Sequence, residues 1–319
     1  MRWSTRWGGL QSARGFSPAF ASSSGAKAPR GMNPALPGLF VLAALSVYAA
    51  GPVDFGKAEL DAALEERKLK LRVDTELSLN PPETFSITLY KTGVARVTGG
   101  DLRGLMYGLI EASEQIRATG KLKAVSAKPA TAVRGVRMTL RSYDLTQPWF
   151  TSDAHWRAYF QMLARARLNR ISLMLALAEA DIERLRILSE TAAEYGVDFV
   201  LGVRHVEGDP QQVYARLRGI LDTCPLIRGV QIEVGDEPPR LYHEGVFPAL
   251  RESGRRVTLD LRGAEARPDL VQAVSASGTP LSPAGFEMEA PGPDFLGGHN
   301  QLYWNNGRTS YDAAYQVAK

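Results

Sequence analysis

The sequence has only one cysteine and four histidines, and both scarcities limit its chemistry. Cys224 has no second thiol to pair with, which excludes an internal disulfide framework and a cysteine-based metal site. We expect it to be buried near the end of a helix. The histidines lack the close spacing that zinc sites use; they are His155, His205, His243 and His299. No metal and no organic cofactor is implied.

Acidic residues are absent from the first 50 positions, which hold five of the 38 basic residues. The formal charge of the whole chain is +4, but the remaining 33 basic side chains face 34 acidic ones. A charge so close to balance after residue 50 gives no support for binding to nucleic acid.

No stretch of the leader is long enough for an ordinary membrane helix. Residues 36–50 are apolar but fall short of the roughly 20 that a span needs, and they end in small residues. We interpret residues 1–50 as a leader, in which a secretory signal peptide begins at Met32 and an over-called start precedes it. A secreted or periplasmic protein without stable membrane insertion is then expected. The alternative is an uncleaved membrane anchor.

The sequence as a whole has the composition of a globular protein. Its 319 residues are 45% hydrophobic and 23% charged, which is enough for one large or two medium domains with a substantial core. Disorder is therefore expected only at the ends.

Residues 51–130 are predicted to form a small α+β domain. Alternating apolar residues indicate strands, and apolar residues at helical spacing indicate a helix that Asp101 caps. The expected strands cover residues 69–73, 85–89 and 94–98, and the expected helices cover residues 54–67 and about 101–116.

Strands and helices alternate after the boundary at residues 128–131, and this order is typical of a parallel sheet covered by helices. The expected strands cover residues 133–140, 170–175, 197–203, 229–234, 257–261 and 284–288. The expected helices cover residues 153–167, 180–195, 211–222 and 268–276.

The fold class is therefore α/β: a small N-terminal α+β domain followed by a TIM-type (β/α) barrel over residues 131–319. A complete eight-stranded barrel takes about 250 residues, and only six strands are countable in the space available. We predict an incomplete barrel, unless residues 292–319 contain compressed elements.

The segment Gly235-Asp236-Glu237 is the leading candidate for chemistry. It follows the fourth predicted barrel strand, and barrel enzymes carry their catalytic groups at the carboxyl ends of strands. Glycoside cleavage needs a proton donor and a second carboxylate, which Glu237 and Asp236 are able to supply. The alternative is an ordinary surface turn, since Gly-Asp-Glu-Pro is a common turn composition.

Other side chains are candidates for substrate binding. Glu233 lies inside the fourth strand, where barrel-lining acids occur, although a buried ion pair with an arginine explains it equally well. His205 follows the third strand, where it is placed to line a pocket, although we prefer the interpretation of a solvated loop residue. Trp149 follows the first strand, and Tyr303 and Trp304 lie in a late irregular stretch; all three have ring faces on which a sugar can stack. For Trp156 we expect simple core packing.

Three segments carry a likeness to known proteins: GDLRGLMYGL at residues 100–109, RGVR at residues 134–137 and LARARLNRI at residues 163–171. With the order of the two parts, they resemble the family 20 glycoside hydrolases, the β-N-acetylhexosaminidases, and the related family 67 α-glucuronidases. The resemblance covers roughly residues 55–290 and implies a small α/β domain before a catalytic barrel.

The same resemblance implies roles for individual residues. Glu237 would protonate the leaving oxygen, Asp236 would hold the acetamido group of the substrate, and Arg134 would grip sugar hydroxyls. The family motif His-x-Gly-Gly-Asp-Glu is kept only in its last three letters, because Ile232 and Val234 replace its histidine and first glycine.

We therefore predict a glycoside hydrolase-like protein that acts on O-glycosidic bonds in oligo- or polysaccharides of the hexosaminide or glucuronide class. Its partner would be a carbohydrate substrate. The alternatives are a non-catalytic carbohydrate-binding barrel and an inactive fragment of a longer hydrolase. The sequence says nothing of the oligomeric state.

Overall fold

A computed structural model describes residues 51–90, 93–262, 267–281 and 300–304. These residues form two β-sheets with their helices, all within the compact unit that spans residues 47–319. The leader and the strand expected at residues 284–288 lie outside the described residues.

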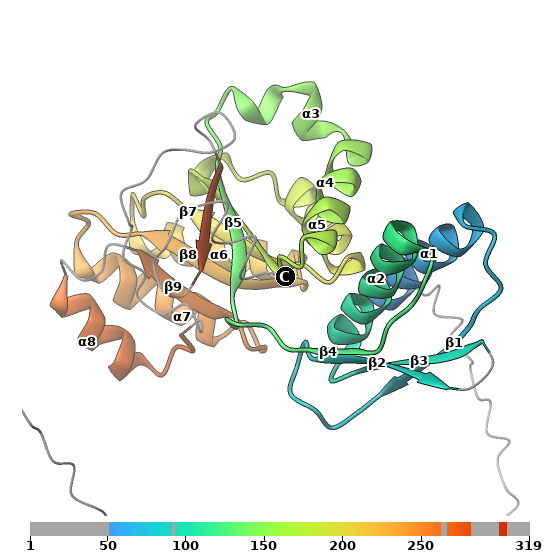
Figure 1. The fold of residues 1–319 in the computed structure, drawn as a ribbon. Helices are drawn as coiled ribbons and strands as arrows, with labels where there is room; N and C mark the ends of the chain where they lie inside the picture. The colour runs from blue at the N-terminus through green and yellow to red at the C-terminus, as the bar shows by residue number, and fades with distance from the viewer. Residues whose placement is uncertain (1–50, 91–92, 263–266, 282–299, 305–319) are drawn as a thin grey trace, which may run out of the picture. The chain divides into compact units, whose positions relative to one another are not determined.

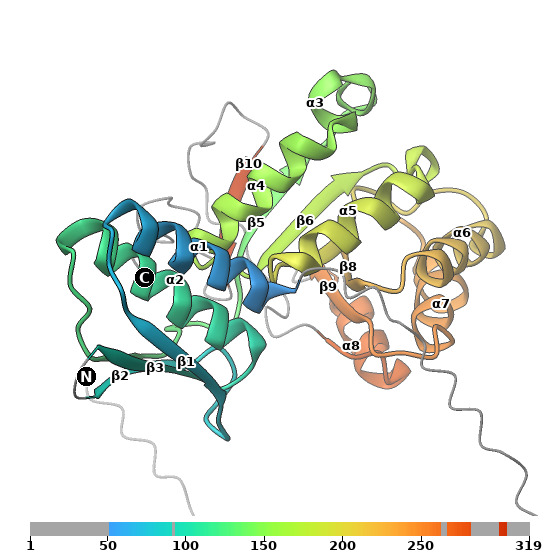
Figure 2. The same cartoon turned by 90° about the vertical axis from the view of Figure 1, so that its right-hand side faces the viewer.

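The small layer has four strands in the order β1-β3-β2-β4. Helices α1 and α2 lie side by side over the sheet of this layer (Figure 2). The elements are α1 (Pro52–Glu66), β1 (Arg72–Leu77), β2 (Phe85–Tyr90), β3 (Val94–Gly99), α2 (Leu102–Thr119) and β4 (Val125–Ala127).

Local chemistry sets both ends of α2. The Asp101 carboxylate accepts a hydrogen bond from the Gly104 amide at 2.6 Å, which confirms the predicted cap. The helix ends at Gly120, whose φ of 67° suits a residue without a side chain. The apolar face between these ends is buried in the main hydrophobic core.

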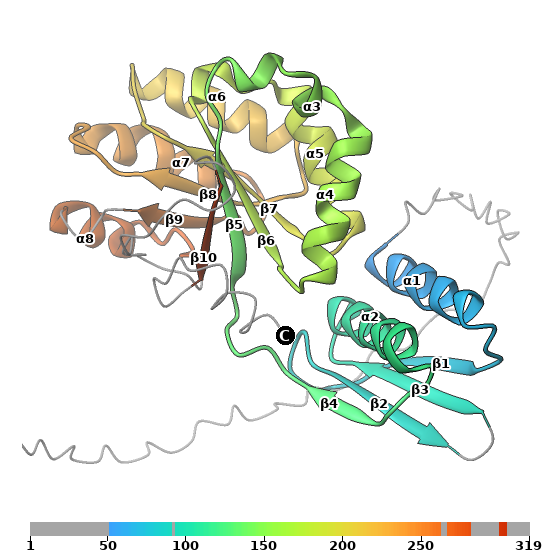
Figure 3. The ribbon, with the colours of Figure 1, turned by 45° about the horizontal axis from the view of Figure 1, so that its top comes forward.

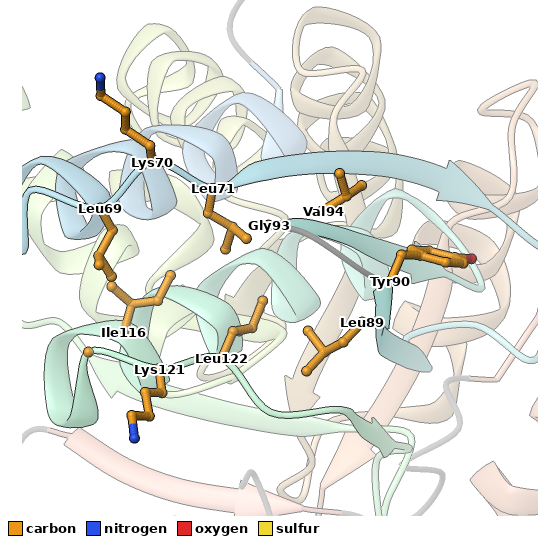
Figure 4. Close-up of a pocket in the computed structure, with 11 residues that line it drawn as sticks. Leu69, Lys70, Leu71, Leu89, Tyr90, Gly93, Val94, Ile116, Lys121 and Leu122 are labelled. Atoms are coloured by element: carbon orange, nitrogen blue, oxygen red, sulfur yellow. The ribbon is translucent and has the colours of Figure 1, made fainter.

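An open groove lies at the end of the small layer, where β2 ends, β3 begins and α2 ends (Figure 4). Its lining is mostly aliphatic, with two lysines: Leu69, Lys70, Leu71, Leu89, Tyr90, Gly93, Val94, Ile116, Gly120, Lys121 and Leu122. This lining contains no carboxylate and no histidine. We assign it no catalytic chemistry.

The second sheet has six strands in the order β10-β5-β6-β7-β8-β9 (Figure 1). Strands β5 to β9 are parallel, and β10 pairs antiparallel with β5. Their bounds are β5 (Arg134–Thr139), β6 (Arg170–Leu175), β7 (Asp198–Val203), β8 (Ile227–Glu233), β9 (Thr258–Arg262) and β10 (Asn300–Trp304).

Helices α4 to α7 line one face of this sheet (Figure 3). The helices are α3 (Pro148–Thr151), α4 (Asp153–Arg165), α5 (Ile182–Glu194), α6 (Pro210–Thr223), α7 (Phe247–Arg251) and α8 (Pro268–Ser277). Shorter turns are η1 (Asp144–Thr146), η2 (Leu177–Glu179) and the π-helical η3 (Leu241–Val246). Cys224 caps the C-terminal end of α6 and is fully buried, as predicted.

The two faces of the large sheet differ in polarity, because successive side chains of a strand alternate. The helix-facing side is apolar and belongs to the main core, as at Leu173, Leu201 and Ile232. The other side, called here the inner face, carries buried polar residues: Arg137, Arg170, Ser172, Gln231, Asp260 and Arg262. The inner face of the sheet therefore presents polar side chains, whereas the helix-facing side is apolar.

The parallel sheet with covering helices confirms the predicted α/β class. The incomplete barrel is seen as five parallel strands and one antiparallel strand at the β5 edge. The expectation that Tyr303 and Trp304 lie in an irregular stretch is wrong, because both residues lie in strand β10.

Ion pairs join the small layer to the large sheet. The Glu83 carboxylate accepts hydrogen bonds from Arg103, Arg134 and Asn169, and Arg103 also bonds Asp198 at 2.7 Å. Glu83 and Arg134 are 9% and 2% exposed, so this pair is buried. The predicted boundary falls between the two sheets, but their division into separate domains stays a prediction.

Acid is expected to weaken this junction. Burial opposes ionisation of Glu83, but the charges of Arg134 and Arg103 outweigh it and hold the pKa of that carboxyl below its ordinary value of 4.5. A carboxyl whose pKa is lower in the folded than in the unfolded protein stabilises the fold fully at a pH above its ordinary pKa. This stabilisation is lost as the pH falls through the lowered, folded-state pKa. The free energy of unfolding, measured with urea at a series of pH values, should therefore decline below about pH 4.5.

The Glu83→Gln protein provides the control for this pH series. It should be less stable at neutral pH and should show a shallower decline in acid. Equal slopes for the two proteins would contradict a stabilising role for the Glu83 charge.

Two glycines offer a matched test of packing. A Cβ added to Gly202 on β7 would lie 2.3 Å from the Met174 sulfur and 2.7 Å from the Leu173 carbonyl oxygen, whereas one added to Gly219 on α6 would meet nothing within 4 Å. We expect Gly202→Ala to cost about 1–3 kcal/mol of unfolding free energy. Gly219→Ala should stabilise by up to about 1 kcal/mol, since alanine favours helix. Similar urea midpoints for both variants would contradict the tight packing around β7.

Candidate functional site

The chain leaves the sheet at the carboxyl end of β8. The last ladder bond runs from the Val234 amide to the Arg262 carbonyl of β9 at 2.8 Å. Gly235, Asp236 and Glu237 follow, so the strand has ended where the two carboxylates begin. Within a strand, two successive side chains would point to opposite faces of the sheet. Because the strand has ended, Asp236 and Glu237 are not held to this alternation.

The Glu237 side chain folds back over its own loop. Its Oε2 accepts a hydrogen bond from the Gly235 amide at 2.7 Å and another from the Tyr242 hydroxyl at 3.3 Å. Its Oε1 lies 3.4 Å from Nδ1 of His205. The carboxylate is 10% exposed, so it is held in place and still reachable from solvent.

Gly235 and Arg267 shape this loop. A Cβ at position 235 would lie 3.2 Å from Oε1 of Glu237, a close contact that glycine avoids. Arg267 donates to the carbonyl oxygens of Gly235 and Glu237 at 2.9 and 3.1 Å, and Asp269 holds its other side. The loop after β8 is thereby tied to the segment that follows β9.

Tyr242 supports Glu237 from below the surface. It lies in η3 and is fully buried, with its ring centroid 6.2 Å from that of Phe247. Burial and the nearby Glu237 charge raise the pKa of Tyr242 well above its ordinary value. The hydroxyl therefore stays protonated and remains a donor to the carboxylate.

His205 comes from a neighbouring strand. It follows β7, and its side chain is 57% exposed. The sequence predicted only that His205 lines a pocket; the structure places it in direct contact with Glu237. Two consecutive parallel strands thus deliver a carboxylate and an imidazole to one spot, as the carboxyl edge of such a sheet allows.

The other two predicted acids differ in exposure. Asp236 is exposed, whereas the neighbouring Glu237 is partly buried. Glu233 is partly buried on the inner face at the end of β8, where Arg262 of β9 is its register partner. The structure therefore brings three carboxylates to the same strand end.

The structure does not bring Arg134 to this end. Arg134 is the first residue of β5, so it lies at the amino edge of the parallel sheet, opposite Glu237. Its guanidinium also donates to the carbonyl oxygens of Thr131 and Arg167. These bonds, with that to Glu83, give Arg134 an anchoring role in place of the sugar-binding role that the resemblance implied.

Tyr303 and Trp304 also lie away from the loop of Glu237. In the antiparallel pairing of β10 with β5, Tyr303 is opposite Gly135 and Trp304 is opposite Arg134. Both residues therefore sit beside the amino end of β5.

Trp149 lies on α3, which follows the carboxyl end of β5. It is half-buried and packs in an aromatic cluster with Phe150, His155 and Trp156. Trp156 is fully buried, and its indole N–H bonds the Phe150 carbonyl, which confirms its predicted core role. Trp149 is on the correct edge of the sheet for a site, but its ring is largely engaged in packing.

Sequence reasoning missed Tyr242 and Arg267. Tyr242 lies five residues after Glu237 in a π-helical turn, a spacing that no helical or strand period indicates. Arg267 reaches the loop from a distant segment. Only the pair Pro238-Pro239, which separates the motif from the next helix, hinted that the chain turns here.

The described residues give two further findings. No three His, Cys, Asp or Glu side chains among them gather closely enough to hold a metal ion. None of their helices is long and apolar enough to cross a membrane.

Several solved structures that share this architecture are glycoside hydrolases. A GH138 enzyme targeting pectin rhamnogalacturonan II aligns with a TM-score of 0.64 at 15% identity over 74% of this chain and 36% of its own. The chain shares the fold of this enzyme. BtGH115A, a GH115 4-O-methyl-α-glucuronidase with specificity for decorated arabinogalactans, shares the fold with a TM-score of 0.51 at 13% identity, over 76% of this chain and 44% of its own.

A family 20 β-N-acetylglucosaminidase also matches, with a TM-score of 0.45 at 14% identity over 65% of this chain and 59% of its own. The GH138 and GH115 structures confirm the glycoside hydrolase-like fold that the sequence predicted, and family 20 is one of several families among the matches. The chain spans less than two thirds of the length of each of these enzymes. No family model and no curated protein matches the sequence.

Proposed function

We propose that this protein cleaves O-glycosidic bonds in oligo- or polysaccharides, with Glu237 as the general acid. The observation that carries the proposal is the placement of the Glu237 carboxyl. It lies at the carboxyl end of β8, is nearly buried and is oriented by Gly235 and Tyr242. A glycoside hydrolase fold keeps its chemistry at this edge of the sheet.

His205 gives Glu237 a route for its proton. The imidazole is exposed on one side and lies 3.4 Å from Oε1 on the other, so it is able to exchange protons between solvent and the carboxyl. A general acid must be reprotonated after each turnover. The pair therefore supports a catalytic carboxyl more than it supports a surface turn.

Asp236 is our candidate for the second carboxylate, as a partner that supports the positive charge developing on the sugar. Its exposure leaves it available to a substrate that covers the loop. Glu233 is a second candidate, because it lies on the inner face at the same strand end. Comparing the Asp236→Asn and Glu233→Gln proteins identifies which of the two acids the reaction needs.

The sequence resemblance and one neighbour support a proposal for the substrate class. We propose hexosaminides or glucuronides, and the described action of BtGH115A on a 4-O-methyl-α-glucuronide favours the second class. The leader suggests that the enzyme meets its polysaccharide in the periplasm or outside the cell.

Turnover of aryl glycosides tests the proposal. A panel that includes N-acetylglucosaminides and glucuronides of both anomeric configurations should contain at least one substrate whose cleavage depends on Glu237. Binding of oligosaccharides without any hydrolysis would instead favour the alternative of a non-catalytic carbohydrate-binding protein.

A further inference from the structure

Arg204 lies at the end of β7, directly before His205. Its amide donates to the Leu175 carbonyl of β6 at 3.1 Å, so the hydrogen bonding between β6 and β7 continues one residue past Val203, the last residue of β7. The side chains of Leu201 and Val203 face the helices and belong to the core. The alternation therefore places Arg204 on the inner face, at the edge where the candidate acid lies.

The guanidinium of Arg204 has no hydrogen bond or ion pair with any residue that the structure describes. Its Nε is buried from solvent, and the side chain as a whole is partly buried. A buried N–H without an acceptor costs free energy, and this cost disappears when a ligand supplies the acceptor. Most arginines around the sheet, by contrast, are engaged, as Arg170 is with Asp260.

A second unmatched group lies nearby on the same face. Gln231 of β8 is the register partner of Gly202, and it is 1% exposed. Its side-chain oxygen has no hydrogen-bond partner in the described part of the chain. Neighbouring strands thus leave one donor and one acceptor unsatisfied on the inner face, toward the carboxyl end.

We propose that Arg204 binds an anionic substituent, a carboxylate or a sulfate, of the sugar that Glu237 cleaves. A guanidinium offers two parallel N–H groups to such an anion, and the geometry is specific for planar or tetrahedral oxyanions. The inference rests on the proposed function for the identity of the ligand as a sugar. It deepens that function by assigning the substrate to the acidic carbohydrates.

Matched substrates test the proposal. We would measure kcat/KM for 4-nitrophenyl glucuronide against glucoside, and for 6-sulfated against unsulfated N-acetylglucosaminide, in each anomeric form. The wild type should favour a charged member. Arg204→Gln should lower kcat/KM for that member about 10- to 100-fold and leave the neutral one unchanged, with Arg204→Lys intermediate. The two pairs distinguish a carboxylate from a sulfate.

Arg228→Gln is the control, because Arg228 is an exposed arginine near the amino end of β8. It should leave both members of each pair unchanged. Equal losses of Arg204→Gln on charged and neutral members would overturn the proposal, as would a wild type without charge preference.

Calorimetric binding separates this inference from the proposed hydrolysis. Glucuronate, glucose 6-sulfate and glucose would be titrated into the Glu237→Gln protein with Arg204 intact or replaced. Binding of a charged sugar that needs Arg204, without turnover of any glycoside, would support the anion site and contradict the hydrolase. Hydrolysis without charge preference would support the hydrolase and contradict the anion site. The absence of both binding and turnover would overturn both proposals.

Discussion

Replacing Glu83 with alanine is expected to lower the free energy of unfolding by about 3–5 kcal/mol. The substitution leaves the 2% exposed Arg134 without its carboxylate and removes an acceptor from Arg103 and Asn169. A buried charge that loses its partner keeps its desolvation cost, which is why the effect should be large. Urea unfolding, followed by fluorescence and circular dichroism, measures it.

The exposed ion pair of the same layer provides the comparison. Glu76 bonds Arg96 at 3.0 Å, and its side chain is 55% exposed. Glu76→Ala should therefore cost no more than about 1 kcal/mol. If the two alanine variants unfold at the same urea concentration, Glu83 does not join the small layer to the large sheet in the way described.

Replacing Glu237 with glutamine is expected to lower kcat/KM about 10²- to 10⁴-fold on the best aryl glycoside. Glutamine keeps the size of the side chain and its carbonyl acceptor for the Gly235 amide, but its amide is not acidic and does not protonate the leaving oxygen. The loss should grow as the leaving phenol becomes a weaker acid, because such a group needs protonation more.

This dependence on the leaving group separates a general acid from a structural residue. A purely structural role would lower turnover of all aryl glycosides by a similar factor. An unchanged urea midpoint in the Glu237→Gln protein would show that the fold survives, and Asp222→Asn, which alters an exposed acid on α6, is a suitable control for activity.

Much of the large sheet was predictable because its strands are short apolar runs between helices. The strand expected at residues 170–175 matches β6, and the bounds of the other four parallel strands lie within two residues of the expected ones. Strand β10 was not predictable as an antiparallel partner of β5. Its pairing depends on contacts more than 160 residues apart, which leave no local pattern.

The candidate site was predictable in place but not in detail. A glycine and two carboxylates after an apolar strand indicated a break at the carboxyl edge, and the structure has Glu237 there. The contacts that hold it come from His205, Tyr242 and Arg267, and tertiary packing alone brings these residues to the loop.

Arg134 shows the limit of reasoning from a resemblance. Its Arg-Gly pair matched a family strand, but the family role requires a guanidinium that is free to meet a sugar. Here Glu83 lies 51 positions earlier in the sequence and engages that guanidinium. The sequence contains no signal for this pairing, since Glu83 lies in a connection without helical or strand periodicity.

The most direct test of a catalytic Glu237 is the kcat/KM of the wild type and the Glu237→Gln protein on a series of aryl glycosides with leaving groups of rising pKa. We predict measurable turnover by the wild type and a loss in the variant that becomes larger along the series, toward about 10⁴-fold. Equal turnover by the two proteins across the series would contradict the account.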